Sequence, residues 1–146
     1  MLDMDHGIFP NVTYGNTTSK NAMEICDKLS IPEGQREIFE VTRCYQTRHG
    51  HGWMSNTKPI QLINNQEEIN VYNEWQTNFK IAELDYELLN YALTVEKNYS
   101  RGIRKNLVMT CLDQRPDFQL DIRKLEESFS RIIKSYSPFS KDMVSN

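Results

Sequence analysis

The stretch Asn106-Leu107-Val108-Met109-Thr110-Cys111-Leu112-Asp113 is the part of the sequence that decides the fold class. Its apolar run is short, uncharged and bounded by polar residues, which is typical of a strand buried on both faces. The earlier stretch 38–45 is β-branched and aromatic with partial alternation, which also indicates a strand. Helical patterns flank both stretches, so the sequence predicts an α/β fold: a partial, mostly parallel sheet flanked by helices.

Three helices are expected from apolar residues at three- and four-residue spacing, over 20–29, 84–95 and 121–134. Ser19 is the expected cap of the first helix. The polar segment 46–68 is expected to be a long loop. The residues expected to face the core from the three helices are Ala22, Ile25, Cys26, Leu29, Leu84, Leu88, Tyr91, Ala92, Val95, Ile122, Leu125, Phe129, Ile132 and Ile133.

The composition fits a single domain over residues 1–146, with 38% hydrophobic residues and a net charge of −3 at pH 7. This charge supplies no basic field, so neither a nucleic acid nor a membrane surface is expected as a partner. No apolar run reaches the roughly 18 residues of a membrane span, and the N-terminal residues do not resemble a signal peptide. The three cysteines lie far apart without Cys-x-x-Cys spacing, which favours a reducing cytoplasm over a disulfide framework or zinc site.

The segment 12–18 offers hydroxyls, amides and a glycine directly before the first expected helix. Backbone N–H groups at such a helix start, together with Ser and Thr hydroxyls, can cradle an anion. The alternative is a loop that only caps the helix. The pattern therefore identifies a candidate anion site and leaves both interpretations open.

A second candidate anion group is Arg48, whose guanidinium can fork onto a phosphate or a carboxylate. Gly50 and Gly52 beside it allow a close approach of the backbone. His49 and His51 could ligate a metal, but no third ligand has a matching spacing, and a mobile glycine-rich loop is the alternative.

Asp113 directly follows the apolar strand at 106–112. Open α/β sheets place ligand contacts at the carboxyl ends of their strands. A carboxylate there can accept two hydrogen bonds from a base with adjacent N–H donors. A turn former or helix cap is the alternative role for such an aspartate.

Taken in chain order, these motifs resemble those of the adenylosuccinate synthetase family. The family has an Asp-rich strand and His-Gly-x-x-Pro-x-Val-Thr-x-x-Asn-Thr-Thr, then Tyr-x-Thr-Arg-Val-Gly-x-Gly, Gly-Trp-Leu-Asp, Thr-Lys-Leu-Asp and Ser-x-Gly-Pro. Five motifs in one order over nearly the whole chain support the resemblance more than any single motif. The stretches that correspond here are 2–7, Pro10, 12–13, 16–18, 45–52, 73–75, 84–85, 110–113 and 135–138, with Met143 beyond.

The resemblance implies a ligase that joins L-aspartate to C6 of a purine monophosphate, using a nucleoside triphosphate and Mg²⁺. The triphosphate phosphorylates the 6-oxygen of the purine, and the amine of aspartate then displaces that phosphate. The family roles carry over to three groups of residues. These are Thr13, Asn16, Thr17 and Arg48 for the purine monophosphate, Gln76, Thr77, Asn78 and Lys80 for the aspartate loop, and Cys111, Leu112, Asp113, Ser135, Tyr136 and Ser137 for the base of the triphosphate.

Several positions depart from the family pattern. The aspartate loop, Thr-Thr-Gly-Arg followed by more Arg in the family, reads Gln76-Thr77-Asn78-Phe79-Lys80 here and keeps one cation. Cys111 replaces the family's Lys in the base-reading motif, and the segment between Asp113 and Ser135 is short. These changes are similar to the shortened phage relatives that act on deoxyguanylate and make the 2-aminoadenine precursor. The substrate, IMP or dGMP, and the donor, GTP or ATP, both stay open.

The family's phosphate loop, Gly-Asp-Glu-Gly-Lys-Gly, does not occur in the sequence, and no residue inherits the catalytic Asp or His. The chain is therefore expected to be the C-terminal portion of the enzyme, inactive alone, with Mg²⁺ ligands supplied elsewhere. Half of a parallel sheet leaves an unpaired edge, so a homodimer or a complementing N-terminal chain is expected. A non-catalytic nucleotide-binding or interaction module, and a decayed remnant without function, are the alternatives.

Overall fold

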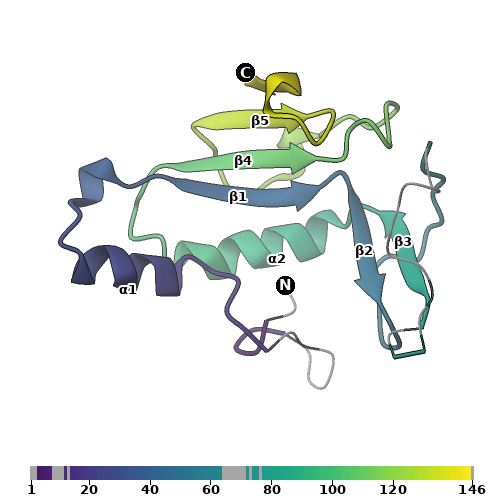
Figure 1. Ribbon diagram of the computed structural model, residues 1–146, viewed down its shortest axis with the longest axis horizontal. Coiled ribbons are helices and arrows are strands. Elements are labelled where there is room, and N and C mark those ends of the chain that lie inside the picture. Colours follow the sequence, from purple (N-terminus) through teal and green to yellow (C-terminus); the bar gives the residue numbers. More distant parts are fainter. Residues whose placement is uncertain are drawn as a thin grey trace.

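The apolar run at 106–112 forms the centre of a four-stranded sheet (Figure 1). The fold is known from a computed structural model, which describes residues 3–7, 12, 14–63, 72, 74–75 and 77–145. Its elements, in chain order, are α1 (Lys20–Lys28), the 3-10 turn η1 (Glu33–Gln35), β1 (Ile38–Arg43), β2 (Tyr45–His49), β3 (Phe79–Glu83), α2 (Tyr86–Lys97), β4 (Lys105–Thr110), η2 (Ile122–Lys124), β5 (Arg131–Ser135), η3 (Ser140–Asp142) and β6 (Met143–Ser145).

The sheet has the strand order β1-β4-β5-β6. β4 pairs in parallel with β1 and with β5, and the short β6 joins β5 in antiparallel orientation. Helices α1 and α2 run along the β1 side of this sheet (Figure 1). The predicted α/β class with a mostly parallel sheet is therefore confirmed. The β-strand pairing aligns the carboxyl ends of β1 and β4, because Arg43 lies opposite Thr110.

The hydrophobic core lies beneath the carboxyl ends of β1 and β4. Leu107 and Met109 of β4 are each 1% exposed, and Cys44, between β1 and β2, is fully buried. Partly buried residues from the segments on either side complete this core: Ile60, Ile81, Leu84, Cys111, Phe118, Leu120, Leu125, Phe129 and Ile132. The core thus fixes the position of the strand ends that carry the candidate site.

The prediction of a helix over 121–134 is wrong. This segment contains only the 3-10 turn η2 and then strand β5, in which Ile132 and Ile133 lie opposite Leu107 and Val108 of β4. Their spacing from Leu125 and Phe129 fits a helix, but β-branched side chains also suit a strand beside a buried partner. The long-range pairing with β4 decides between the two.

The prediction of one strand at 38–45 and a long loop over 46–68 is also wrong in part. The strand ends at Arg43, and a separate strand, β2, pairs in antiparallel orientation with β3, so that Tyr45 lies opposite Glu83. The partner strand is more than thirty residues away in the sequence. Local composition cannot reveal such a pairing, because β2 is polar and its ladder partner, β3, lies in a distant segment.

Two of the three predicted helices are present, with differences in detail. Helix α2 begins after Asp85, whose carboxylate accepts a hydrogen bond from the Leu88 amide at 3.0 Å. Helix α1 buries Met23, while Ile25 and Leu29 of the expected inner face are 57% and 66% exposed. The inner face of α1 is therefore not the one that its apolar spacing predicts. In the part of the chain that the structure describes, no helix is both long and apolar enough to cross a membrane.

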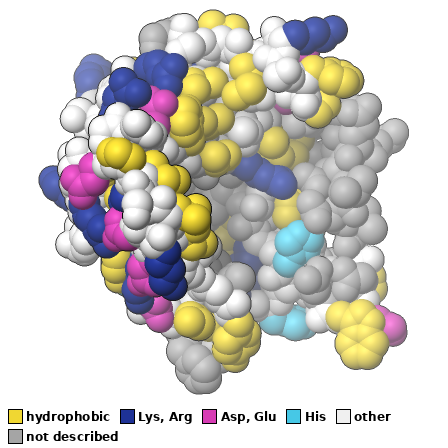
Figure 2. Space-filling model, turned by 60° about the vertical axis from the view of Figure 1, so that its left-hand side comes forward, with side chains coloured by type: hydrophobic (Ala, Val, Ile, Leu, Met, Phe, Trp, Pro, Cys, Tyr) yellow, Lys and Arg dark blue, Asp and Glu magenta, His cyan; other side chains and the backbone are white. Residues whose placement is uncertain are grey.

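Charged side chains at the amino ends of the strands pair with one another. Asp27 lies 2.7 Å from both Arg36 and Arg101, and Glu37 lies 2.9 Å from Arg104 and 2.7 Å from Arg131. Figure 2 shows the two kinds of charge interspersed on one side, next to a hollow bordered by hydrophobic side chains. Hydrogen bonds from Arg101 and then Arg36 lower the pKa of Asp27. These carboxylates and guanidinium groups thus form ion pairs with one another at this end of the molecule.

Candidate functional site

A cavity of about 400 Å³ opens where the carboxyl ends of β1, β4 and β5 meet. Parallel strands bring their carboxyl ends to the same edge of a sheet, which is where such folds place ligands. Four of the predicted base-binding residues line it, namely Cys111, Asp113, Ser135 and Ser137. The other lining residues are Arg43, Tyr45, Leu62, Thr110, Gln114 and Pro138.

The turn after β4 sets the direction of these side chains. Cys111 has a φ of +61°, in the left-handed region, which turns the chain sharply after Thr110. The Leu112 amide donates to the Ser135 carbonyl at 3.2 Å, and the Gln114 amide donates to the Cys111 carbonyl at 3.1 Å. As a result Leu112 is buried in the core and does not line the cavity, whereas Asp113 stands exposed on its rim.

Asp113 presents a carboxylate that a ligand can reach. Its Oδ2 accepts a hydrogen bond from Gln114 Nε2 at 2.9 Å, which orients the carboxylate without burying it. A carboxylate has more acceptor positions than this one contact uses. The arrangement is therefore suited to a ligand that presents N–H donors, such as the edge of a nucleobase.

The turn after β5 forms the opposite wall. Ser135 Oγ donates to the Ser137 carbonyl at 2.9 Å, and Ser137 Oγ donates to Asp142 Oδ2 at 2.5 Å while accepting from the Phe139 amide at 3.0 Å. Tyr136 is 46% exposed and does not line the cavity. Because the hydroxyl groups of Ser135 and Ser137 bond to neighbouring groups of the same turn, they stabilise the conformation of this cavity wall.

Sequence analysis missed Arg43, Tyr45 and Gln114 as lining residues. The Arg43 guanidinium carbon lies 5.7 Å from the centroid of the Tyr45 ring, and Arg43 Nη1 lies 3.4 Å from the Tyr45 hydroxyl. Burial, with a contribution from neighbouring Cys111, raises the pKa of Tyr45 to about 12. One feature of the sequence could have indicated Arg43. It lies near the end of a predicted strand, as Thr110 does, and parallel strands bring such ends together.

The β2–β3 ribbon brings together two cations from different predicted groups. Arg48, predicted for the purine monophosphate, lies directly opposite Lys80, predicted for the aspartate loop. Arg48 Nη2 donates to the His51 carbonyl and Lys80 Nζ donates to the Gly52 carbonyl, both at 3.2 Å. Like charges at directly opposite positions repel, and an anion bound between them relieves that repulsion.

Thr77 and Asn78 of the predicted aspartate loop lie at the same end of the ribbon. The Asn78 carbonyl accepts from the Gly50 amide at 3.2 Å, and Thr77 has a φ of +58°. Gln76 is outside the described residues. The His49 ring packs against Phe79 with the centroids 4.7 Å apart, and no group of three His, Cys, Asp or Glu side chains suited to a metal is present among the described residues.

Asn16 and Thr17 belong to a hydrogen-bond network around the fully buried Asp3. The amide and hydroxyl of Thr17 each donate to Asp3 Oδ2 at 3.2 Å, and Asn16 Nδ2 donates to Asp5 Oδ2 at 3.0 Å. Burial opposes ionisation of Asp3, but hydrogen bonds from Thr17 and His6 outweigh it and lower its pKa. In this conformation the side chains of Asn16 and Thr17 donate hydrogen bonds to carboxylates of the protein. Thr13 is outside the described residues.

Ser19 is the N-cap residue of α1, as predicted, but the expected side-chain cap is absent, because its side chain makes no capping hydrogen bond. Its backbone amide donates instead to Glu96 Oε2 of α2 at 2.8 Å. The carboxylate of a distant helix thus satisfies this amide.

Comparison with known proteins gives one family. The sequence pattern described as adenylosuccinate synthetase matches residues 1–119. Over 53 residues, the chain is 42% identical to the adenylosuccinate synthetase of Helicobacter acinonychis (strain Sheeba); this segment is 36% of the chain and 12% of that relative. No solved structure matches the chain significantly. The family match includes the turn at 110–113, whereas Ser135, Tyr136 and Ser137 lie beyond it.

Proposed function

The chain belongs to the adenylosuccinate synthetase family, and on that premise we propose that it supplies the base-binding and anion-binding parts of a cytoplasmic purine nucleotide ligase. The reaction joins L-aspartate to C6 of a purine monophosphate. A nucleoside triphosphate, with Mg²⁺ to neutralise its charge, phosphorylates the 6-oxygen, and the aspartate amine then displaces phosphate.

The observation that carries this proposal is the convergence of two distant turns on one cavity. Cys111 and Asp113 follow β4, Ser135 and Ser137 follow β5, and all four line the same 400 Å³. Asp113 offers acceptors to the base of the triphosphate, and the Ser135 turn forms a wall beside it. The cavity therefore supports a base pocket at this edge of the sheet.

The pair of Arg48 and Lys80 supports the anion-binding part of the proposal. Their positions on opposite strands place two positive charges at one end of the ribbon. The substrates of the proposed reaction are all anionic, through a phosphate or through carboxylates. In the proposed enzyme Arg48 pairs with the purine monophosphate and Lys80 with a carboxylate of aspartate.

The reaction needs groups that this sequence lacks. Gly-Asp-Glu-Gly-Lys-Gly does not occur in it, so we place the phosphate loop, the catalytic Asp and His and the Mg²⁺ ligands in residues beyond these 146. The chain acts as the C-terminal portion and is completed by an N-terminal polypeptide; a homodimer would cover the sheet edge but would add none of the groups that the sequence lacks. The substitutions at 76–80 and at Cys111 support the phage branch, with dGMP in place of IMP and with ATP or GTP as donor.

A second candidate function is a nucleotide-binding module without catalysis. It is favoured by one combination of observations: the cavity to which we assign the base is present at the strand ends, while the sequence contains no phosphate loop. Both candidates require that the chain bind a purine nucleotide. They differ in whether a complementing polypeptide restores turnover.

The test combines binding with turnover. Calorimetry with GTP and with ATP is expected to show binding that Asp113→Asn weakens and that the control Asp117→Asn, on a neighbouring exposed carboxylate, leaves unchanged. The purified chain should not consume triphosphate with aspartate and IMP or dGMP. Absence of binding to either triphosphate at millimolar concentration would overturn both candidates, and turnover by the chain alone would overturn the placement of the catalytic groups elsewhere.

A further inference from the structure

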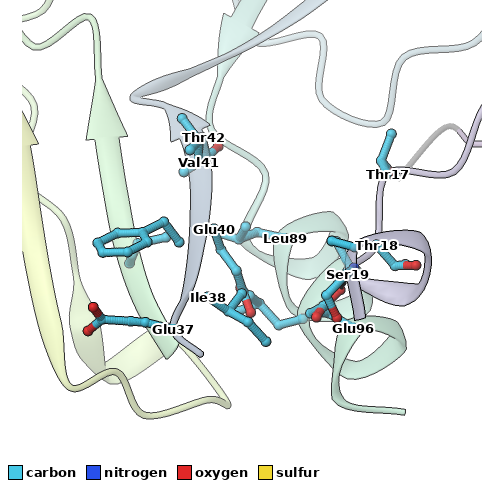
Figure 3. A pocket seen from close by; sticks show the side chains of 15 residues that line it. Thr17, Thr18, Ser19, Glu37, Ile38, Glu40, Val41, Thr42, Leu89 and Glu96 are labelled. Carbon is cyan, nitrogen blue, oxygen red and sulfur yellow. Dashed lines mark hydrogen bonds between the residues drawn. The ribbon is translucent and has the colours of Figure 1, made fainter. Parts of the chain in front are cut away.

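A second cavity, of about 590 Å³, separates β1 from helices α1 and α2 and shares no lining residue with the strand-end cavity. Its walls are mostly apolar. Figure 3 shows Glu40 reaching into it from β1, with Ser19 and Glu96 on the opposite wall. The apolar lining of the cavity includes Ala22 of α1, Leu93 of α2, Ile38 of β1 and Leu107 of β4.

Three oxygens in this cavity have no hydrogen-bond partner among the described residues. They are Glu40 Oε1, Glu96 Oε1 and Ser19 Oγ, and all three atoms are buried. Glu96 as a whole is only 5% exposed, and its other oxygen accepts from the Ser19 amide. A buried acceptor without a donor is costly, and folded proteins rarely leave one unpaired. Lys105 Nζ, whose charge acts on Glu40, is likewise buried without a hydrogen-bond partner in the described part of the chain, so no hydrogen bond joins it to these oxygens.

The charges around the cavity favour a positively charged donor for these oxygens. Glu96 and Glu127 lie close enough to Glu40 to disfavour its charge, and Lys105, 3.1 Å from Glu127, is the cation that acts on Glu40. Burial, opposed by Lys105 and reinforced by Glu96 and Glu127, raises the pKa of Glu40 to about 7. Above this pKa the three carboxylates outnumber the one ammonium, and the net negative charge favours a cationic ligand.

The cavity adjoins a strand edge that is unpaired within the described part of the chain. β1 is the outermost strand of its sheet, and Phe39 and Val41 on it are 47% and 67% exposed. An edge of this kind pairs readily with a further extended polypeptide segment. The matched relative extends far beyond the 12% of its length that this chain matches, so its family fold includes much more polypeptide.

We propose that this cavity binds a primary ammonium group, the lysine side chain of a polypeptide segment that lies along the free edge of β1. An ammonium has three donors and no acceptor, which matches Glu40 Oε1, Glu96 Oε1 and Ser19 Oγ one for one. The alkyl stem of lysine suits the apolar walls. A planar guanidinium carries five donors in a fixed fork, two more than the number of unpartnered oxygens here. This inference does not depend on the ligase reaction.

The first experiment uses n-pentylammonium as a lysine side-chain probe, titrated into the isotope-labelled chain and followed by amide NMR shifts at pH 8. We expect shifts at Ser19, Glu40 and Glu96 that uncharged n-pentanol does not produce. Glu96→Gln should weaken binding about tenfold or more, whereas Glu87→Gln, an exposed carboxylate on the same helix, should leave it unchanged. Binding that n-pentanol reproduces, or that survives both Glu96→Gln and Glu40→Gln, would overturn the proposal.

The amide spectrum of each variant also reports whether it is folded. If Glu96→Gln is not folded, Glu40→Gln carries the same test, because its side chain is only partly buried. In the unmodified chain, binding should strengthen from about pH 6 to about pH 8 as Glu40 ionises, and Glu40→Gln should remove that dependence. Mn²⁺ that broadens the same amides at lower concentration than n-pentylammonium shifts them would replace the ammonium by a divalent cation and overturn the assignment.

A second experiment tests the polypeptide as the source of the ammonium. A short extended peptide, Val-Lys-Val with blocked ends, should shift the β1 amides in addition to those of the cavity, and the matching Val-Gln-Val peptide should not. Binding of n-pentylammonium without binding of the lysine peptide would overturn the strand-edge occupant. Purine nucleotide binding is measured in parallel and is expected to be unaffected, so failure here is distinguishable from failure of the proposed function.

Discussion

The two cavities beside β1 differ in how their polar groups are satisfied. At the strand-end cavity the hydroxyls of Ser135 and Ser137 bond within their own turn, and Asp113 faces solvent. In the cavity under β1, Glu40 and Glu96 keep buried oxygens without partners. The first region is complete without a ligand and ready to receive one, whereas the second requires a cation to complete it. The exposure of the acceptors makes the difference, because Asp113 lies on a rim in contact with solvent, whereas the oxygens of Glu40 and Glu96 are buried.

The largest expected effect comes from the residue that supports both regions. Leu107 is 1% exposed, belongs to the core under the strand ends and also lines the cavity under β1. Leu107→Ala should lower the free energy of unfolding by about 3 kcal/mol, since it removes buried apolar volume from the central strand. Urea denaturation measures this loss. Leu29→Ala, on the exposed side of α1, is the control and should change stability by less than about 0.5 kcal/mol.

The next effect separates binding from stability at the strand-end cavity. Asp113→Asn should weaken purine triphosphate binding by about tenfold to a hundredfold, the range for a lost hydrogen bond to a charged group. Because Asp113 is exposed, the melting temperature of the Asp113→Asn variant should stay close to that of the unmodified chain. Calorimetry and thermal denaturation measure the two quantities. A large loss of stability with unchanged binding would assign Asp113 to the turn instead of to the ligand.

At the cavity under β1 the expected effect is on stability and not on nucleotide binding. The ionisation of Glu40 should lower the free energy of unfolding in a pH-dependent way, with no nucleotide present. The folded-state pKa of Glu40, about 7, is raised above its ordinary value of 4.5. The free energy of unfolding therefore falls as the pH rises from about the ordinary pKa, 4.5, to about the folded-state pKa, 7, and it is constant above that pH. Glu40→Gln removes this loss and should stabilise the protein by about 1 to 2 kcal/mol at pH 8, after discounting for partial exposure. Denaturation of both forms at pH 4 and pH 8 checks the sign, and a benefit that is largest at pH 4 would contradict it.

The smallest expected effect concerns the β2–β3 ribbon. Lys80→Gln removes the charge opposite Arg48 and should raise the unfolding free energy by a few tenths of a kcal/mol in the absence of anions. The same variant should weaken binding of L-aspartate. Thermal denaturation at low salt and a titration with aspartate measure the two effects. Destabilisation with unchanged aspartate binding would contradict an anion site at this ribbon.

The base-reading part of the site could be predicted because it follows from the end of one strand. An apolar run that ends at Leu112 and is followed by Asp113 places a carboxylate at a sheet edge in any parallel arrangement. The register of β1 against β4 then brings Arg43, at the end of its own strand, and Tyr45 to the same cavity, and this register cannot be predicted from either strand alone. Likewise, Arg48 and Lys80 are 32 positions apart and become neighbours only through the pairing of β2 with β3.

The sequence by itself determined the α/β class, the central strand, two of the helices and the resemblance to a family, because these depend on local periodicity and on motifs of adjacent residues. Only the tertiary structure decided that residues 131–135 form a strand, that 45–49 pair with 79–83, and that Glu40 and Glu96 share a cavity. Each of these rests on pairing or burial between distant segments. Such contacts outweigh local preference because the side chains and backbone groups that they satisfy are removed from water together.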